Sequence, residues 1–294
     1  MTSALDTATR STLLAFQKAE ATDSVVYARM AKTEKHESHR HTLEQIALDE
    51  REHYEVWKRY TGVDVPANRF RATLFTVLMI LLGYTFVLRL MERGEDRTAE
   101  AYGKLTEAIP EIKEIIAHEQ EHEEKLIAML DEERLQYVGA IVLGLNDALV
   151  ELTGTIAGLT FALTNTRMVA LAAIITGIAA TLSMGASNYL AEKADHNPHP
   201  LKAALYTGVA YLITVTVLVF PYLILDEHLY LLAFAIMLVS CIFIIFAFNF
   251  YLSVAQRLPF WSRFGHMAAI SLGVAAISFI IGLAAKALLG VDVA

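Results

Sequence analysis

Charged and apolar positions are distributed differently in the two halves of this 294-residue chain. Charged residues occur throughout the first 134 positions. Five apolar segments then follow one another, at roughly 138–163, 168–190, 201–225, 229–252 and 265–289. Each is near or above the roughly 20 residues that a helix needs to cross the hydrocarbon core of a bilayer. The pattern predicts an all-α chain, with a water-soluble helical domain over 1–134 and a five-helix transmembrane domain over 135–294.

The front domain is acidic. It holds 18 of the 24 Lys and Arg and 25 of the 32 Asp and Glu, a net charge of −7. This sign argues against nucleic acid as a partner and suits cations. The single cysteine, Cys241, lies in an apolar segment, so the sequence offers neither a disulfide framework nor a Cys-based metal site.

Basic residues near the span ends predict how the chain crosses the membrane. Five of them fall on one side of the spans: Arg134, Lys193, Lys202, Arg257 and Arg263. The other side has Arg167 and the acidic pair Asp226 and Glu227. The positive-inside rule therefore predicts a cytosolic N-terminus and an external C-terminus. Residues 1–10 lack the apolar core of a signal peptide, so we expect the front domain to stay in the cytosol.

Two Glu-x-x-His motifs are the main candidate chemistry of the front domain, which reads as four long helices with one helix-breaking region at Gly62–Pro66. The motifs are Glu50 with His53 on the second helix and Glu119 with His122 on the fourth. A spacing of three places each pair on one helix face. A di-iron carboxylate bundle needs two such pairs and one Glu from each other helix, for which Glu20 and Glu92 are available. One pair alone is typical of a solvated acidic surface, but two on alternate helices favour a metal site.

Residues from about 10 to 130 resemble the rubrerythrin branch of the ferritin-like superfamily. The resemblance implies a ferritin-like four-helix bundle with a di-iron centre. It assigns as ligands Glu20, Glu50, His53, Glu92, Glu119 and His122, with Glu95 as a further ligand that depends on redox state. Rubrerythrins usually carry a Cys-rich rubredoxin module, which a lone cysteine cannot form. That departure weakens a peroxidase role and leaves metal sensing, ferrous oxidation or metal delivery.

The third helix of this domain contains an uncharged stretch of seventeen residues, Ala72–Leu88. A sixth span there would put Glu92 and Glu119 across the membrane from Glu20 and Glu50. We therefore interpret the stretch as a docking surface. Residues 74–79 are expected at the bilayer surface or against the membrane domain, and residues 80–88 against the bundle core or a dimer partner.

The first span carries two acids, Asp147 and Glu151, four residues apart and hence on one helix face. A charged residue at that depth costs about 3 kcal/mol or more and usually marks an ion path. A position near the cytosolic end, where water lowers the cost, is the alternative. In the second span, Met184 and Asn188 offer a thioether and an amide oxygen beside small residues. Such a Met is more often packing, but next to an acidic span it becomes a plausible Fe²⁺ ligand.

Residues from about 135 to 290 are similar to the vacuolar iron transporter family. The likeness rests on the five spans, on Asn146-Asp147 in the place of an Asp-Gly motif, and on the Ser183-Met184-Gly185 signature. It implies a homodimer that exchanges Fe²⁺ or Mn²⁺ for protons, with Asp147 and Met184 along the path. The acidic insert of plant members is reduced here to residues 191–200. The front domain is expected to take over its collecting role.

Both domains together look like the membrane-bound ferritins of bacteria and archaea. That likeness implies an iron exporter in a prokaryotic inner membrane. A different class stays open: a membrane-anchored di-iron oxidase or peroxidase that uses its spans as an anchor. An anchor does not need Asp147 and Glu151 on one face, so the transporter is the favoured interpretation.

Overall fold

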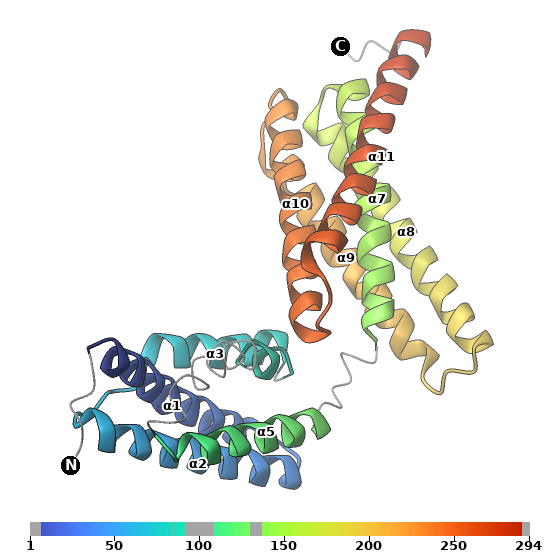
Figure 1. Ribbon diagram of the computed structural model, residues 1–294. Helices are drawn as coiled ribbons and strands as arrows, with labels where there is room; N and C mark the ends of the chain where they lie inside the picture. Colours follow the sequence, from blue (N-terminus) through green and yellow to red (C-terminus); the bar gives the residue numbers. More distant parts are fainter. Residues whose placement is uncertain (1–6, 84, 92–108, 130–136, 290–294) are drawn as a thin grey trace. The chain divides into compact units, whose positions relative to one another are not determined.

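The computed structural model describes residues 7–83, 85–91, 109–129 and 137–289, and those ranges are helical apart from turns and the extended segment 62–68. The chain divides into two compact units, Met1–Glu132 and Glu133–Ala294. We call them unit 1 and unit 2. Figure 1 shows the course of the chain through each unit.

Unit 1 begins with a helical hairpin. Helix α1 (Thr7–Thr33) and helix α2 (Glu37–Thr61) pack side by side and are joined by three residues. Helix α2 ends at Gly62, whose φ of 72° is left-handed and suits glycine, and whose N–H bonds the carbonyl of Lys58. The predicted break at Gly62–Pro66 is therefore confirmed. The extended segment that follows is held to α1, because Gln17 donates to the carbonyl of Val63 at 2.9 Å.

The third predicted helix is interrupted, so its prediction as one continuous helix is wrong. Helix α3 (Arg69–Leu82) starts at Asn68, whose side chain accepts from the N–H of Arg71. It ends at Gly83, where φ is 92°, and residues 85–91 form a separate helical segment. A hydropathy pattern does not reveal such a break, since Gly83 is as uncharged as its neighbours.

The core of unit 1 joins its helices around one aromatic pair. Phe16 of α1 and Trp57 of α2 have ring centroids 5.6 Å apart. Helix α5 (Ile112–Ala128) closes over them with Ile112 and Ile115, and Ile109 joins from the turn before it. This core fixes α1, α2 and α5 against one another at the level where the polar cluster described below is found.

Unit 2 consists of five helices long and apolar enough to cross a membrane, as predicted. They are α7 (Val138–Leu163), α8 (Thr166–Ala194), α9 (Pro200–Ile224), α10 (Tyr230–Ala255) and α11 (Phe260–Leu289). The turns between them carry the expected stop signals. Asn165 caps α8 by accepting from the N–H of Met168, and Pro200 opens α9. Arg167 and Asn165 both contact the Glu227 carboxylate, which ties the α7–α8 turn to the α9–α10 turn.

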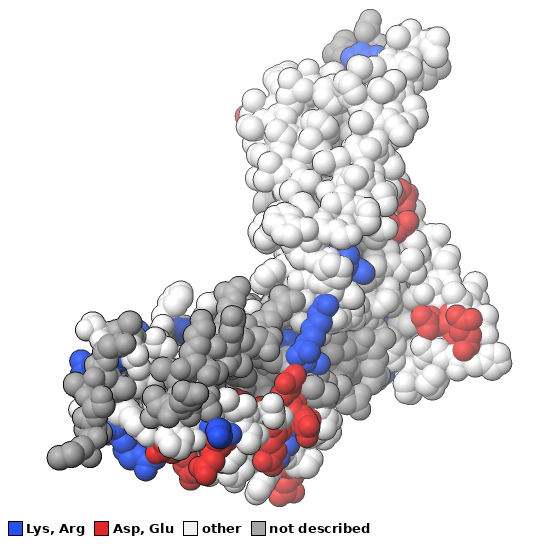
Figure 2. Space-filling model, viewed as in Figure 1, with Lys and Arg blue, Asp and Glu red and all other residues white. Residues whose placement is uncertain are grey.

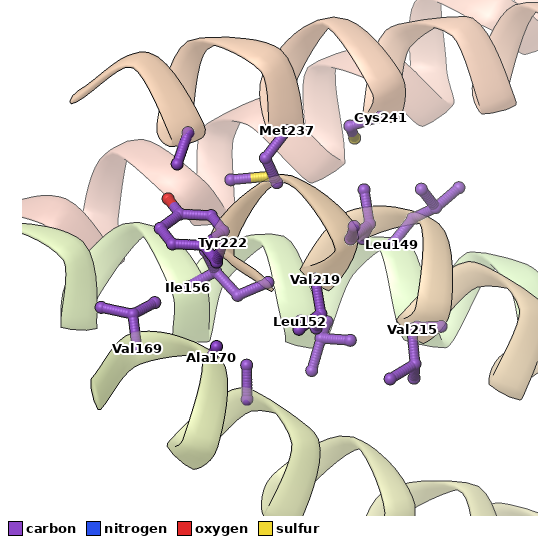
Figure 3. Close-up of a cluster of buried hydrophobic side chains, with 14 of the residues drawn as sticks. Leu149, Leu152, Ile156, Val169, Ala170, Val215, Val219, Tyr222, Met237 and Cys241 are labelled. Atoms are coloured by element: carbon purple, nitrogen blue, oxygen red, sulfur yellow. The ribbon is translucent and has the colours of Figure 1, made fainter. Parts of the chain in front are cut away.

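Helix α7 is the centre of unit 2. It packs against α8, α9, α10 and α11, and it is the most buried and least apolar of the five spans. Around it lies a core of aliphatic and aromatic side chains, of which Figure 3 shows Leu149, Leu152 and Ile156 of α7 facing Val219 and Tyr222 of α9. The outer helices expose large apolar residues, as helices in contact with lipid do.

Glycines allow α7 to approach two neighbours very closely. A Cβ added at Gly144 would collide with the backbone of Thr207 on α9. A Cβ added at Gly282 of α11 would collide with the backbone of Gly158 on α7. Small residues at helix contacts are a common packing device in membranes. These two seams fix the position of α7, and with it the acids that it carries.

Candidate functional site

Unit 1 contains a buried cluster of carboxylates and imidazoles. Ligand atoms of Glu20 from α1, Glu50 and His53 from α2, and Glu119 from α5 all lie within 4.8 Å of one another. The His53 Nδ1 atom is 3.3 Å from Glu119, 3.5 Å from Glu50 and 3.9 Å from Glu20. The Glu-x-x-His spacing therefore does what helical geometry requires, placing each carboxylate beside the imidazole one turn later.

His122 completes the cluster from α5. Its Nδ1 atom is 3.5 Å from Glu50 and 3.9 Å from Glu119. Glu50 thus lies between the two imidazoles, at 3.5 Å from each. The structure brings together five of the residues predicted from the sequence. Glu92 and Glu95, the other two, lie outside the described residues.

The geometry of the cluster fits a metal ion. Both imidazole Nδ1 atoms are buried and lack a hydrogen-bond partner of good geometry, although carboxylate oxygens surround them. Burying such atoms without partners is costly. A cation placed among the carboxylate oxygens would receive these two lone pairs as well. Mixed oxygen and imidazole donors suit iron and manganese among the divalent metals.

The outer nitrogen of each imidazole is held by a residue that the sequence analysis did not single out. His122 Nε2 donates to Asp49 at 3.0 Å, which leaves its Nδ1 lone pair directed into the cluster. His53 Nε2 shares a 3.2 Å hydrogen bond with the exposed His118. Outer partners of this kind fix the orientation of metal-binding imidazoles. Asp49 directly precedes Glu50 in the sequence, and His118 lies four positions before His122. No spacing rule, however, identifies either of them as an outer partner.

Trp57 adds a third outer contact. Its buried indole N–H donates to Glu20 at 3.1 Å. The indole also packs against Phe16 in the core of unit 1. One side chain therefore links the cluster to the hydrophobic core, and it restricts the rotamers that the Glu20 carboxylate can adopt.

The pKa values in the cluster show that it holds more negative charge than its surroundings stabilise. Burial raises the pKa of Glu20 well above its usual range, and the nearby Glu50 and Glu119 carboxylates raise it further. Burial also raises the pKa of Glu50. Burial disfavours the charged form of His53, but Glu119, Glu50 and Glu20 outweigh it and raise the pKa of His53 to about 10. Protons and a cation would therefore compete for these groups.

The second group of candidate residues lies on α7 in unit 2. Asp147 is half-buried and Glu151, one turn later, is exposed. The buried Tyr211 of α9 donates its hydroxyl to Glu151 at 2.8 Å. Tyr211 is a third polar group at this position, which the apolar pattern of its own span did not reveal.

Met184 and Asn188 on α8 have other contacts. Met184 is half-buried against the hydrophobic core of unit 2. The buried Asn188 donates to Thr207 of α9 at 2.8 Å, and the single Thr207 hydroxyl proton is shared between the carbonyls of Ala140 and Ala203. No described hydrogen bond joins this pair to the α7 acids. Their role on an ion path stays a prediction.

Comparison with known proteins bears on unit 2. The model of the VIT family matches residues 138–198, which comprise α7, α8 and the start of the following turn. No curated protein and no solved structure matches the chain. The family match does not extend to unit 1, whose ferritin-like nature stays a prediction. Residues 138–198 therefore carry a VIT family domain, which suggests metal ion transport across a membrane by the unit that holds Asp147 and Glu151.

Proposed function

We propose that the chain exports a divalent metal ion, Fe²⁺ or Mn²⁺, from the cytosol in exchange for protons. The ion passes through unit 2, and unit 1 binds the same kind of ion before delivery. The observation that carries the proposal is the acid pair Asp147 and Glu151 on one face of α7, inside the VIT family domain.

Carboxylates on a membrane span suit coupled exchange. A metal ion and a proton compete for the same oxygen atoms, so each carboxylate releases one on accepting the other. The Tyr211 hydroxyl holds Glu151 in a fixed orientation at 2.8 Å. Asp147, four residues earlier and on the same helix face, is half-buried and would accept the ion beside it. Outward movement of the metal then accompanies inward movement of protons.

A homodimer and a cytosolic N-terminus belong to the same proposal. Glu151 is exposed on a span whose neighbours are lipid or protein. An ionisable side chain in contact with lipid is expensive, and a second copy placed against α7 would remove it from lipid. The five basic residues on one side of the spans support placing that side, and unit 1, in the cytosol.

The cluster in unit 1 supports the collecting role. Glu20, Glu50, His53, Glu119 and His122 would hold the metal, with Asp49, His118 and Trp57 orienting them. Bound iron would supply the ferrous–ferric couple. The residues themselves supply negative charge, imidazole lone pairs and exclusion of water, all of which favour a cation over the surrounding solvent.

The test is Fe²⁺ entry into proteoliposomes that expose the cytosolic face and have an acidic lumen. We expect uptake by the wild type and none by Asp147→Asn. Asp226→Asn is the matched control, since it removes an exposed acid from the turn after α9. Glu119→Ala should slow uptake at low Fe²⁺ concentration only. Equal uptake by Asp147→Asn and the wild type would overturn the transport path.

A membrane-anchored di-iron oxidase is the second candidate, because the cluster of unit 1 is buried and provided with outer partners. In the same vesicles it predicts no Fe²⁺ entry for the wild type. It also predicts oxygen-dependent iron oxidation that is lost in Glu119→Ala and retained in Asp147→Asn.

A further inference from the structure

Unit 1 is polarised in charge. Helices α2 and α5 together carry eleven acidic and six basic residues. Helices α1 and α3 carry six basic residues and only two acids, Glu20 and Asp23, both of which are buried. The view in Figure 2 shows acidic side chains gathered over α2 and α5. The surface that α1 and α3 present is therefore basic, although the domain as a whole is acidic.

Helix α3 adds an apolar face to this basic surface. Besides Leu81, which is 64% exposed, four large apolar residues of α3 are exposed: Phe70 by 79%, Leu74 by 41%, Val77 by 44% and Ile80 by 65%. They follow one another at intervals of four, three and three, which places them on one side of the helix. We call these four residues the α3 face. The opposite side of α3 is already used, because Ala72, Phe75 and Met79 are buried.

Both helices of this surface carry exposed basic side chains. Helices α1 and α3 run in the same direction, since Thr22 accepts from the N–H of Asn68 and Arg29 donates to Thr76. Lys18 and Lys32 of α1 are exposed, as is Arg69 at the start of α3. An apolar helix face with basic neighbours is the composition of a helix that lies in the headgroup region of a bilayer.

We propose that the α3 face binds the anionic lipid surface of the membrane that unit 2 spans. Its apolar side chains would enter the boundary between headgroups and acyl chains, and the basic residues of α1 and α3 would contact lipid phosphates. Each Lys or Arg near an anionic surface contributes about 1 kcal/mol. The first span begins at Val138, six residues after unit 1 ends, so the tether keeps the α3 face at high effective concentration near the bilayer.

A second copy of the chain is the other partner that an apolar face can take, and charge disfavours it here. A symmetric contact places the same patch of both copies together. The exposed basic residues of α1 and α3 would then be brought close to those of the second copy. The area is also small, because a 14-residue helix is about 21 Å long and a stable interface needs about 800 Å² per partner.

The test uses the full chain in vesicles of phosphatidylcholine with phosphatidylglycerol. The buried Cys241 is replaced by Cys241→Ser, and a nitroxide label is attached after Leu74→Cys, or after Glu44→Cys as the control on exposed α2. We expect the label at 74 to become several-fold more accessible to oxygen and less accessible to a water-soluble nickel chelate than the label at 44. The difference should shrink in vesicles of phosphatidylcholine alone.

A second variant excludes a folding defect. Here the nitroxide label is attached at position 70, after Phe70→Cys. The double substitution Leu74→Glu and Val77→Glu should return this label to water, while Co²⁺ binding by the cluster stays unchanged. Nickel accessibility at 74 equal to that at 44 would overturn the proposal. Spin–spin coupling between labels of two copies, equal in vesicles and in detergent, would overturn it in favour of a dimer.

Discussion

Both units of the chain place acids where water is scarce, but they do so in different ways. The cluster of unit 1 draws its candidate ligands from α1, α2 and α5, and its imidazoles have outer partners. The pair in unit 2 comes from one helix, and a single hydroxyl contacts it. Many ligands fixed by outer contacts favour retention of an ion. Few ligands favour release, which a transport path requires.

The largest expected effect is on Co²⁺ affinity and comes from replacing Glu50, the carboxylate between the two imidazoles. In the Asp147→Asn background, Glu50→Ala should lower Co²⁺ affinity by about 1000-fold, above the roughly 10- to 100-fold typical of an outer partner. Absorption titration of the full chain measures it. The exposed Glu52→Ala, two residues away, is the control and should bind like the parent. Equal loss in both variants would mean that the cluster does not bind the ion.

The proton competition should appear as a pH dependence of the same titration. The raised pKa of Glu20, caused by burial and by Glu50 and Glu119, means that protons compete at a pH above the usual carboxylate range. Affinity should therefore fall as pH falls, by about tenfold per pH unit for each proton displaced. Proton release measured on Co²⁺ addition checks the sign. A binding constant independent of pH between 5 and about 7 would contradict it.

An outer partner should matter less than a ligand. Asp49→Asn keeps the shape of the side chain but weakens its acceptance of the His122 N–H, so Co²⁺ affinity should fall by about 10- to 100-fold. The Co²⁺ absorption spectrum should still indicate the same set of ligands. Glu44→Gln, an exposed acid on the same helix, serves as the control. A spectrum that loses a nitrogen ligand would make Asp49 essential to the fold of the site rather than a positioning residue.

The single contact to the acid pair of unit 2 is tested by Tyr211→Phe. Loss of the hydrogen bond to Glu151 should reduce Fe²⁺ uptake by about tenfold at limiting ion concentration. Tyr222→Phe is a close control, because it removes a buried hydroxyl of the same helix that contacts Thr160 instead. Equal uptake by both variants would show that Glu151 needs no fixed orientation.

The smallest effect is expected from Trp57→Phe. The variant keeps an aromatic ring against Phe16 and loses the hydrogen bond to Glu20, so Co²⁺ affinity should fall by about threefold. Trp261→Phe, an exposed tryptophan of unit 2, is the control. A loss as large as that of Glu50→Ala would make the contact to the core as important as a ligand.

The sequence predicted what depends on periodicity. Five spans were confirmed because about 20 apolar residues have few other structures available to them. The residues of the two Glu-x-x-His motifs lie together with Glu20 because a spacing of three on a helix leaves little freedom. Their metal-binding role, like the path through Met184 and Asn188, stays a prediction.

What the sequence did not predict depends on contacts between distant residues. Asp49 acts on His122 from 73 positions away, and Tyr211 reaches Glu151 across 60. The break at Gly83 depends on a backbone conformation that hydropathy does not encode. The same limit applies to the α3 face, since burial of Phe75 and exposure of Leu74 are set by the position of α1.

The glycine seams of α7 have a consequence for how unit 2 tolerates change. At Gly144 and Gly282, backbone meets backbone with no side chain between them. Because the backbones are already in contact, neither seam has room for a side chain. A single added methyl group would act there as a wedge. Alanine at Gly144 would therefore push α7 away from α9, and alanine at Gly282 would push it away from α11, so either change would displace Asp147 without altering any ionisable group.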